Sequence, residues 1–152
     1  MSRVEDLERL YRERGNRLWW ALLAFTGDRE VTNDAMAEAF AQALKRGDRI
    51  RVPERWVTRA AFRIAAGELK VRRREVALTR EDTYEMPEQA RELQDALRRL
   101  PRKQRASVTL HHLGGYPVRE IAAIIGSTPA AVRVHLSQGR KRLRKILEEG
   151  RG

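Results

Sequence analysis

The feature that most constrains this sequence is residues 118–147, VREIAAIIGSTPAAVRVHLSQGRKRLRKIL. Its first part has apolar residues at helical spacing and ends at Gly126, a residue that is common just past the end of a helix. Ser127 or Thr128 can accept hydrogen bonds from the free N–H groups of a following helix, and Pro129 suits the first turn of that helix. The stretch therefore predicts two helices joined by a turn of three residues.

The second of these helices has an apolar side and a basic side. Its inward residues are Val132, Leu136, Leu143 and Leu147, and its outward residues are Arg133, Gln138, Arg140, Lys141, Arg144 and Lys145. No Asp or Glu occurs between Arg133 and Lys145. Two helices, a short turn and a basic second helix are typical of a helix-turn-helix, whose second helix enters the major groove of DNA. An ordinary helical hairpin with a solvated basic face is the alternative, and the spacing and the lack of acidic residues disfavour it.

Charge is unevenly distributed along the 152 residues, whose net charge is +11. Residues 1–76 are basic, residues 77–92 are acidic and residues 93–152 are strongly basic. We expect two small domains, residues 1–76 and 91–152, joined by an acidic linker at residues 77–90. Helical periodicity dominates throughout, which predicts an all-α fold. A strongly basic chain favours polyanions, either nucleic acid or an anionic membrane.

Two helices are predicted in the first 46 residues. The first covers residues 3–25, and its apolar stripe is Val4, Leu7, Leu10, Tyr11, Leu18, Leu22 and Phe25. Asp28 is the expected cap of the second helix, which runs to about Arg46. Asp34, Glu38 and Gln42 share one face of this helix at four-residue spacing, and a solvated face is the simplest interpretation of its two acids.

A basic loop, residues 45–53, precedes a third helix that runs from Glu54 to about Glu75. This helix interleaves arginines with aromatic residues, a pattern that suits single-stranded DNA because cations follow the phosphates while Trp stacks on bases. Phe62 is expected in the core, whereas Trp56 fits a core position and a base-stacking position equally well. Two further helices are expected, separated by Pro101. One runs from Glu88 to Leu100, with Leu93, Ala96, Leu97 and Leu100 inward, and the other runs from Arg102 to Leu113.

The order of these parts resembles that of bacterial sigma factors of the extracytoplasmic-function (ECF) type, which consist of regions 2 and 4 of the sigma-70 family. Residues 100–105, LPRKQR, are similar to the start of region 4, and residues 115–122, GYPVREIA, to its first helix-turn-helix segment. Residues 131–143, AVRVHLSQGRKRL, are similar to its second helix. In the other half, residues 33–40, NDAMAEAF, resemble region 2.2, and residues 53–74 resemble regions 2.3 and 2.4.

Three positions depart from the family pattern. Ala37 replaces the usual Gln, Arg63 falls where Asn is common, and Gly67 falls where Asp is common. These departures bear on polymerase docking and on the choice of promoter.

The resemblance implies a function in transcription initiation with core RNA polymerase and promoter DNA as partners. Region 2.2 docks on the clamp helices of the β′ subunit, which implies polymerase contacts for Asp34, Glu38 and Gln42. Region 4 lies on the β flap and reads the −35 duplex, and the acidic linker lies near the active-site cleft and the RNA exit channel. ECF sigma factors are commonly held by an anti-sigma factor, which is a further expected partner.

Two sets of residues are expected to contact DNA. The −35 set in region 4 is Arg119, Thr128, Arg133, His135, Ser137, Gln138, Arg140, Lys141 and Arg144. The −10 set in region 2, for the melted non-template strand, is Arg49, Arg51, Trp56, Arg59, Arg63, Lys70, Arg72, Arg73 and Arg74. Arg can contact guanine, and Gln138 adenine, through paired hydrogen bonds, whereas Arg140, Lys141 and Arg144 are better placed for phosphates.

Other functions are less consistent with the sequence. No cysteine is present, adjacent His111 and His112 diverge on a helix, and no catalytic or phosphate-binding motif occurs, so we expect neither an enzyme nor a metal or other cofactor. No signal peptide or long apolar stretch occurs, which predicts a cytoplasmic protein without membrane insertion. The main alternative is an autonomous helix-turn-helix regulator that binds duplex DNA without polymerase, and a third is a helical adaptor whose main partner is a protein.

Overall fold

The computed structural model describes residues 2–75 and 87–150, including the backbone but not the side chains of residues 72–75, and every regular element within these ranges is a helix. The elements are α1 (Arg3–Thr26), α2 (Arg29–Arg46), the 3₁₀ turn η1 (Gly47–Arg49), α3 (Pro53–Glu75), α4 (Glu88–Arg98), α5 (Arg102–His112), α6 (Val118–Ile125) and α7 (Pro129–Gly150). The predicted all-α fold is confirmed. Most of the acidic segment expected as a linker lies outside the described residues.

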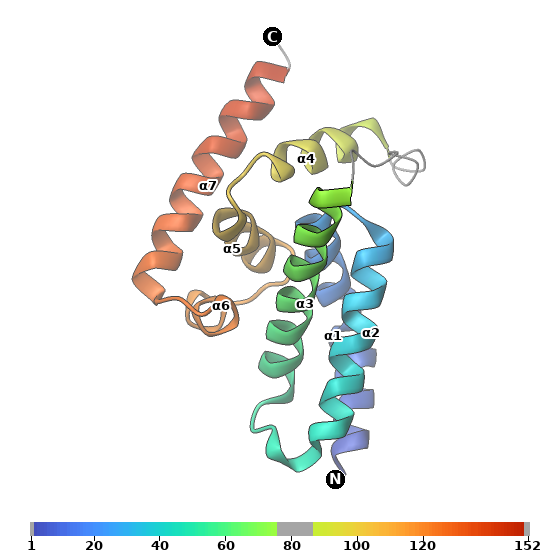
Figure 1. The fold of residues 1–152 in the computed structure, drawn as a ribbon. Helices are drawn as coiled ribbons and strands as arrows, with labels where there is room; N and C mark the ends of the chain where they lie inside the picture. Colours follow the sequence, from blue (N-terminus) through green and yellow to red (C-terminus); the bar gives the residue numbers. More distant parts are fainter. Residues whose placement is uncertain (1, 76–86, 151–152) are drawn as a thin grey trace.

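Helices α1, α2 and α3 pack side by side in the N-terminal half (Figure 1). The predicted cap is present, because Asp28 accepts a hydrogen bond from the N–H group of Val31 at 3.0 Å. Helix α1 ends at Gly27, whose φ of 68° is left-handed and therefore favours glycine. These local signals place the turn between α1 and α2 where the sequence predicts it.

The core of this half has an aromatic centre. Phe25 and Phe62 are buried with ring centroids 5.1 Å apart, which confirms Phe62 as a core residue. The predicted stripe on α1 is wrong at two positions, because Val4 and Tyr11 are mostly exposed. Val4 lies in the first turn of α1, opposite the short η1 turn, and Tyr11 lies at the rim, where its ring meets the edge of Phe40.

Helices α6 and α7 form the predicted helix-turn-helix in the C-terminal half. Gly126 ends α6 with a left-handed φ of 67°, and the Thr128 hydroxyl accepts a hydrogen bond from the N–H group of Ala131 at 3.1 Å. Val132 is fully buried between the helices, as expected for the residue that fills their angle. Helix α5 packs against α7, and Gly139 of α7 sits at this contact.

Helix α4 turns most of its predicted face inward, because Ala96, Leu97 and, just past the end of the helix, Leu100 are buried as expected. Leu93, expected inward, is 41% exposed, while Gln94 is buried. The Gln94 side-chain amide donates a hydrogen bond to the backbone oxygen of Ala24 at 3.0 Å, at the C-terminal end of α1. Gln94 is thus an additional inward residue of α4, with a polar partner at the end of α1.

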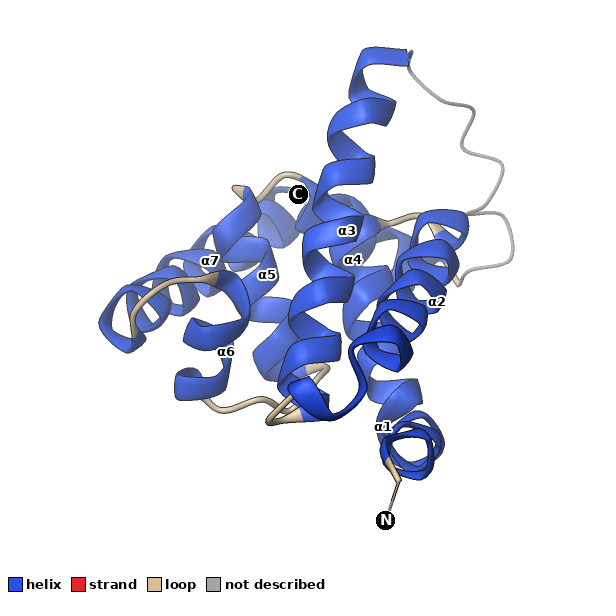
Figure 2. Ribbon diagram, turned by 60° about the horizontal axis from the view of Figure 1, so that its bottom comes forward, coloured by secondary structure: helices blue, strands red, loops and turns tan. Residues whose placement is uncertain are grey.

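The two halves pack against each other along α3 and α1, because α6 contacts α3 while α4 and α5 contact α1 (Figure 1). Figure 2, turned by 60°, shows α3 between α2 on one side and α5 and α6 on the other. In both views α2 and α7 lie at opposite edges of the molecule. The surfaces expected to contact polymerase and the −35 duplex therefore face away from each other.

Candidate nucleic-acid interface

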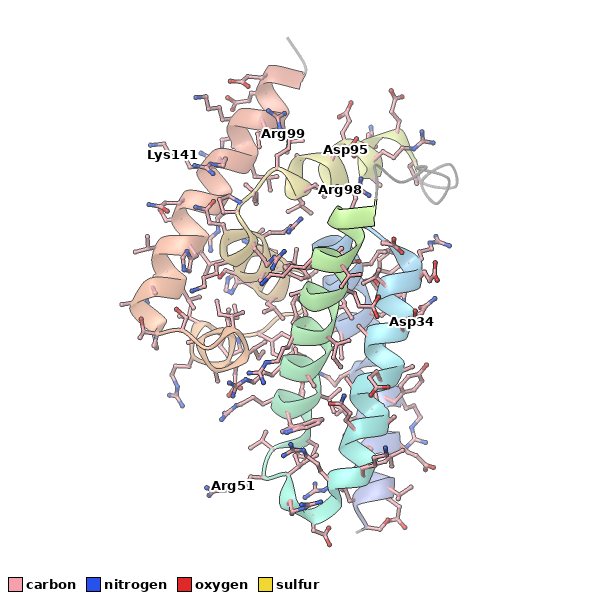
Figure 3. The ribbon with its side chains drawn as sticks, viewed as in Figure 1. Asp34, Arg51, Asp95, Arg98, Arg99 and Lys141 are labelled. Carbon is pink, nitrogen blue, oxygen red and sulfur yellow. The ribbon has the colours of Figure 1, made fainter. Side chains whose placement is uncertain are left out.

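Helix α7 presents a continuous basic surface. Arg133, Ser137, Gln138, Arg140, Lys141 and Arg144 are exposed, and His135 is half-buried. Figure 3 shows Lys141 pointing away from the rest of the molecule at the outer edge of α7. Arg119 of α6 and Thr128 of the turn are also exposed. The structure therefore exposes every residue of the predicted −35 set except His135, which is half-buried. By helical spacing, Arg133, Ser137, Arg140 and Arg144 share one face of α7.

Two of these side chains are held by helix α5. The Gln104 amide donates a hydrogen bond to the side-chain oxygen of Gln138 at 3.3 Å, and the Nε of Arg140 donates one to the Nε2 of His112 at 3.1 Å. Partial burial lowers the pKa of His112, and the positive charge of Arg140 lowers it further. A neutral His112 accepts this hydrogen bond, so α5 limits the directions in which Arg140 can point. No pattern in the sequence predicts this hydrogen bond between Arg140 and His112.

The predicted −10 set lies on and before α3. Arg49 and Arg51 are exposed in the loop between α2 and α3, and Figure 3 shows Arg51 pointing outward from it. The loop is anchored because Ile50 is buried and because the guanidinium of Arg3 donates hydrogen bonds to the backbone oxygens of Gly47 and Ile50 at 3.0 and 2.7 Å. A fixed loop keeps its arginines beside the start of α3.

On α3 itself, Arg59, Arg63 and Lys70 are exposed and share a face by their spacing of four and seven residues. Trp56 is half-buried, and the guanidinium carbon of Arg46 lies 5.4 Å from its ring centroid. Arg46 is thus a cation–π partner of Trp56 that the sequence analysis did not identify. Arg72, Arg73 and Arg74 belong to the last turns of α3, but their side chains lie outside the described part of the chain.

Asp34, Glu38 and Gln42 come together on the outer face of α2. Both carboxylates are exposed, and the amide of Gln42 donates a hydrogen bond to the Oε1 of Glu38 at 3.0 Å. Figure 3 shows Asp34 at the edge of the molecule opposite Lys141. Ala37 and Ala41 are also exposed on this helix, and Leu44 is 51% exposed. A face of small and apolar residues with two acids is suited to contact with a protein rather than with DNA.

No helix within residues 2–75 and 87–150 is long and apolar enough to cross a membrane. The same residues contain no group of three or more His, Asp or Glu side chains that could hold a metal ion.

Comparison with known proteins agrees with this geometry. Residues 90–143 match the family model of sigma-70 region 4. Among solved structures, the sigma factor RpoE in complex with the anti-sigma factor NepR from Bartonella quintana matches with a TM-score of 0.77 and 18% identity over 95% of this chain and 98% of that chain. CnrH in complex with the cytosolic domain of CnrY matches with a TM-score of 0.73 and 20% identity over 94% of this chain and 88% of that chain. No curated protein sequence matches the chain. Residues 90–143 are therefore similar to sigma-70 region 4, and the described part of the chain has the fold of the two solved structures.

Proposed function

We propose that this chain is a sigma factor of the ECF type that divides its work between two halves. Residues 1–76 act as region 2, residues 77–90 as a linker and residues 91–152 as region 4. In this proposal the protein binds core RNA polymerase and directs it to promoters. The observation that carries it is the match of residues 90–143 to sigma-70 region 4, because this segment contains the exposed basic surface of α7.

Region 4 reads the −35 duplex through α7. A helix of this width enters the major groove, where Arg133 and Gln138 are exposed for hydrogen bonds to base edges. Arg140, Lys141 and Arg144 continue along the same surface and hold phosphates, which positions the helix without reading the sequence. The support from His112 directs Arg140 toward the DNA backbone.

Region 2 binds the melted strand of the −10 element. The anchored loop presents Arg49 and Arg51, and α3 continues the positive surface with Arg59 and Arg63. Arg46 lies over one face of Trp56, so a base can stack on that face only after this guanidinium moves aside. We therefore assign capture of the strand first to the arginines and only then to the indole.

Core polymerase binds the face of α2 that contains Asp34, Glu38 and Gln42. This face lies across the molecule from α7, so polymerase and the −35 duplex can be bound without competing for one surface (Figure 3). The small side chain of Ala37, where the family has Gln, lets a partner helix approach α2 closely.

An anti-sigma factor is the third partner in this proposal. The two solved structures named above are both complexes, one with the anti-sigma factor NepR and the other with the cytosolic domain of CnrY. Because this chain shares their fold over almost its whole length, a regulator of the same kind can bind it in the same way.

The double variant D34R/E38R is expected to bind core polymerase at least about tenfold more weakly than the wild type, because it replaces two attractive charges with repulsive ones at the proposed contact. The measurement is retention of bacterial core RNA polymerase by the immobilised chain, titrated to give an apparent Kd. Wild-type retention with loss in the variant supports both the function and the docking face.

The matched control is E5R/E8R, which makes the same change of charge at two exposed acids of α1. If both double variants lose binding equally, the effect is one of net charge and the α2 face is not the contact. If the wild type itself is not retained but binds duplex DNA alone in a salt-sensitive manner, the chain acts as the autonomous regulator instead.

Replacing Arg133 with alanine is expected to relax sequence preference at one position of the −35 element, with a loss of about 1–3 kcal/mol of base discrimination. The measurement is selection of duplex DNA from a randomised pool by the complete holoenzyme, followed by sequencing. The comparison variant Lys141→Ala removes a proposed phosphate contact, so it should weaken all sequences alike and reduce the salt dependence. Unchanged preferences in Arg133→Ala would remove this residue from the base-reading set.

A further inference from the structure

The outward face of α7 changes in character along the helix. Its central line consists of residues spaced by four, three and four positions, and all of them are exposed: Ala130, Val134, Ser137 and Lys141. Figure 3 shows Lys141, the last of them, pointing away from the rest of the molecule. Val132 lies on the opposite side of the helix and is fully buried. The outward line of α7 therefore begins with short apolar side chains and ends with a long cation.

Val134 is the exception on this outward line, because it is a large apolar side chain that is 51% exposed. About half of its surface faces solvent, so packing within the described residues does not account for a valine at this position. Helix formation does not account for it either, since valine is a poorer helix former than alanine, lysine or arginine. A valine at the centre of an outward face is consistent with a ligand outside the chain.

The charges beside Val134 indicate the class of this ligand. By helical spacing, Arg133 and Arg140 border the outward line on one side and Lys145 borders it on the other, and all three are exposed. Residues 129–147 of α7 contain no Asp or Glu. Cations on both sides of an apolar strip match the major groove of duplex DNA, where phosphates form the walls and base edges form the floor.

The position of Val134 along α7 places it where a recognition helix reaches base edges. Residues near the N-terminus of such a helix contact the bases, and Val134 lies in the second turn, directly after Arg133. The short side chain of Ala130, one turn earlier, allows the helix to approach the floor of the groove closely. Valine is branched at Cβ and stiff, so it presents its methyl groups in a fixed direction. Thymine is the base that offers a methyl group in the major groove.

We propose that Val134 reads the C5 methyl group of a thymine, on either strand, at a base pair next to the one that Arg133 reads. Neighbouring residues of a helix point in directions about 100° apart, so these two side chains reach different base pairs. The −35 element of this chain therefore contains a thymine beside the base contacted by Arg133. This inference rests on the proposed function and adds to it a residue that specifies sequence without a hydrogen bond.

The test removes the methyl group from the DNA, so the wild-type protein can be used. The preferred −35 duplex is selected by the complete holoenzyme, and the base read by Arg133 is identified with the Arg133→Ala variant. Each thymine of the element is then replaced in turn by deoxyuridine, which lacks only the C5 methyl group. The replacement beside the base read by Arg133 is expected to weaken binding about fourfold. No loss at that position, or a selected element without a thymine there, would overturn the proposal.

A protein variant assigns the lost methyl contact to Val134. In Val134→Ser the apolar contact is already absent, so the same deoxyuridine replacement should no longer weaken binding. The matched control is Val4→Ser on α1, where the valine is 52% exposed, and this variant should keep the fourfold effect. Circular dichroism verifies that both variants are folded. A fourfold effect that persists in Val134→Ser would overturn the assignment of the thymine to this residue.

A second arm separates this contact from the proposed function. Selection and the deoxyuridine series are repeated with the chain alone at low salt, where binding of α7 to duplex DNA needs no polymerase. If no holoenzyme forms but the chain alone shows the methyl effect, the proposed function fails and the contact of Val134 stands. If the holoenzyme binds its promoter without a methyl effect, the function stands and this inference fails. If neither form binds duplex DNA, both fail, and the apolar strip of α7 is a surface for a protein instead.

Discussion

Replacing Phe25 with alanine is expected to lower the free energy of unfolding by about 3–5 kcal/mol. Phe25 is 2% exposed, its ring lies 5.1 Å from that of Phe62, and the guanidinium carbon of Arg105 lies 5.0 Å from its centroid. It also lines a hollow of about 220 Å³ between the halves. The space left by the ring would join a hollow that is already present, so neighbouring side chains cannot close it by a small shift.

Chemical denaturation followed by circular dichroism measures this loss. The matched control is Tyr11→Ala on the same helix, where the aromatic side chain is 61% exposed. A change there should cost much less, because the ring keeps most of its contact with water in the folded state. Equal losses at the two positions would show that Phe25 does not have the central place in packing that its burial indicates.

The local elements could be predicted from the sequence because their signals are contained in a few neighbouring residues. Asp28, Gly126 and Thr128 each act within one turn of a helix, and the structure confirms the expected helix ends at all three. The exposed positions of Arg133 and Lys141 follow in the same way from the spacing of apolar residues on α7.

Predictions that depended on distant partners were less successful. Leu93 of α4 is exposed, while the neighbouring Gln94 is buried and donates a hydrogen bond to the backbone oxygen of Ala24, a partner 70 positions away that no periodicity reveals. Val4 shares a helical face with Leu7, but it lies in the first turn of α1 and is 52% exposed. Periodicity predicts the face of a helix on which a side chain lies. It does not predict whether a neighbouring element extends far enough to cover that side chain.

The contact between the halves was not predictable from the sequence. Arg55 looked like a member of a basic face, and Glu120 and Tyr116 looked like parts of a helix-turn-helix motif. Only the folded chain brings Arg55 to Glu120 and Thr58 to Tyr116. The cation–π pair of Arg46 and Trp56 was also not predictable. The sequence fits Trp56 equally well to a core position and to a base-stacking position, and it indicates no partner for the indole ring.

Replacing Gly139 with alanine is expected to lower the free energy of unfolding by about 1–3 kcal/mol. Alanine is the better helix former by about 1 kcal/mol, so on α7 alone the change would stabilise. A Cβ atom at Gly139 would lie 2.9 Å from the Cγ2 of Val108, which is buried on α5, and 3.4 Å from the Cβ of Gln104. Val108 is branched at Cβ and stiff, so α5 and α7 must move apart to accept the new methyl group.

Two further variants distinguish this clash from a general effect of removing glycine. In the double variant G139A/V108A the opposing methyl groups of Val108 are absent. The loss in free energy of unfolding of the double variant should therefore be smaller than the sum of the losses of the two single variants. Gly67→Ala on α3 has no atom within 4 Å of its new Cβ, and it should raise the free energy of unfolding by about 0.4–1 kcal/mol. Thermal unfolding measures both effects.

The G139A variant also tests whether the packing of α7 on α5 affects DNA binding. Gly139 directly precedes Arg140, whose guanidinium is held by His112 of α5. If α7 moves away from α5, Arg140 loses this support together with the hydrogen bond between Gln104 and Gln138. Promoter affinity of the G139A holoenzyme should therefore fall at a temperature where the variant is still folded. A variant that loses stability but keeps full affinity would show that the α5–α7 contact supports the fold of region 4 without positioning its DNA-binding surface.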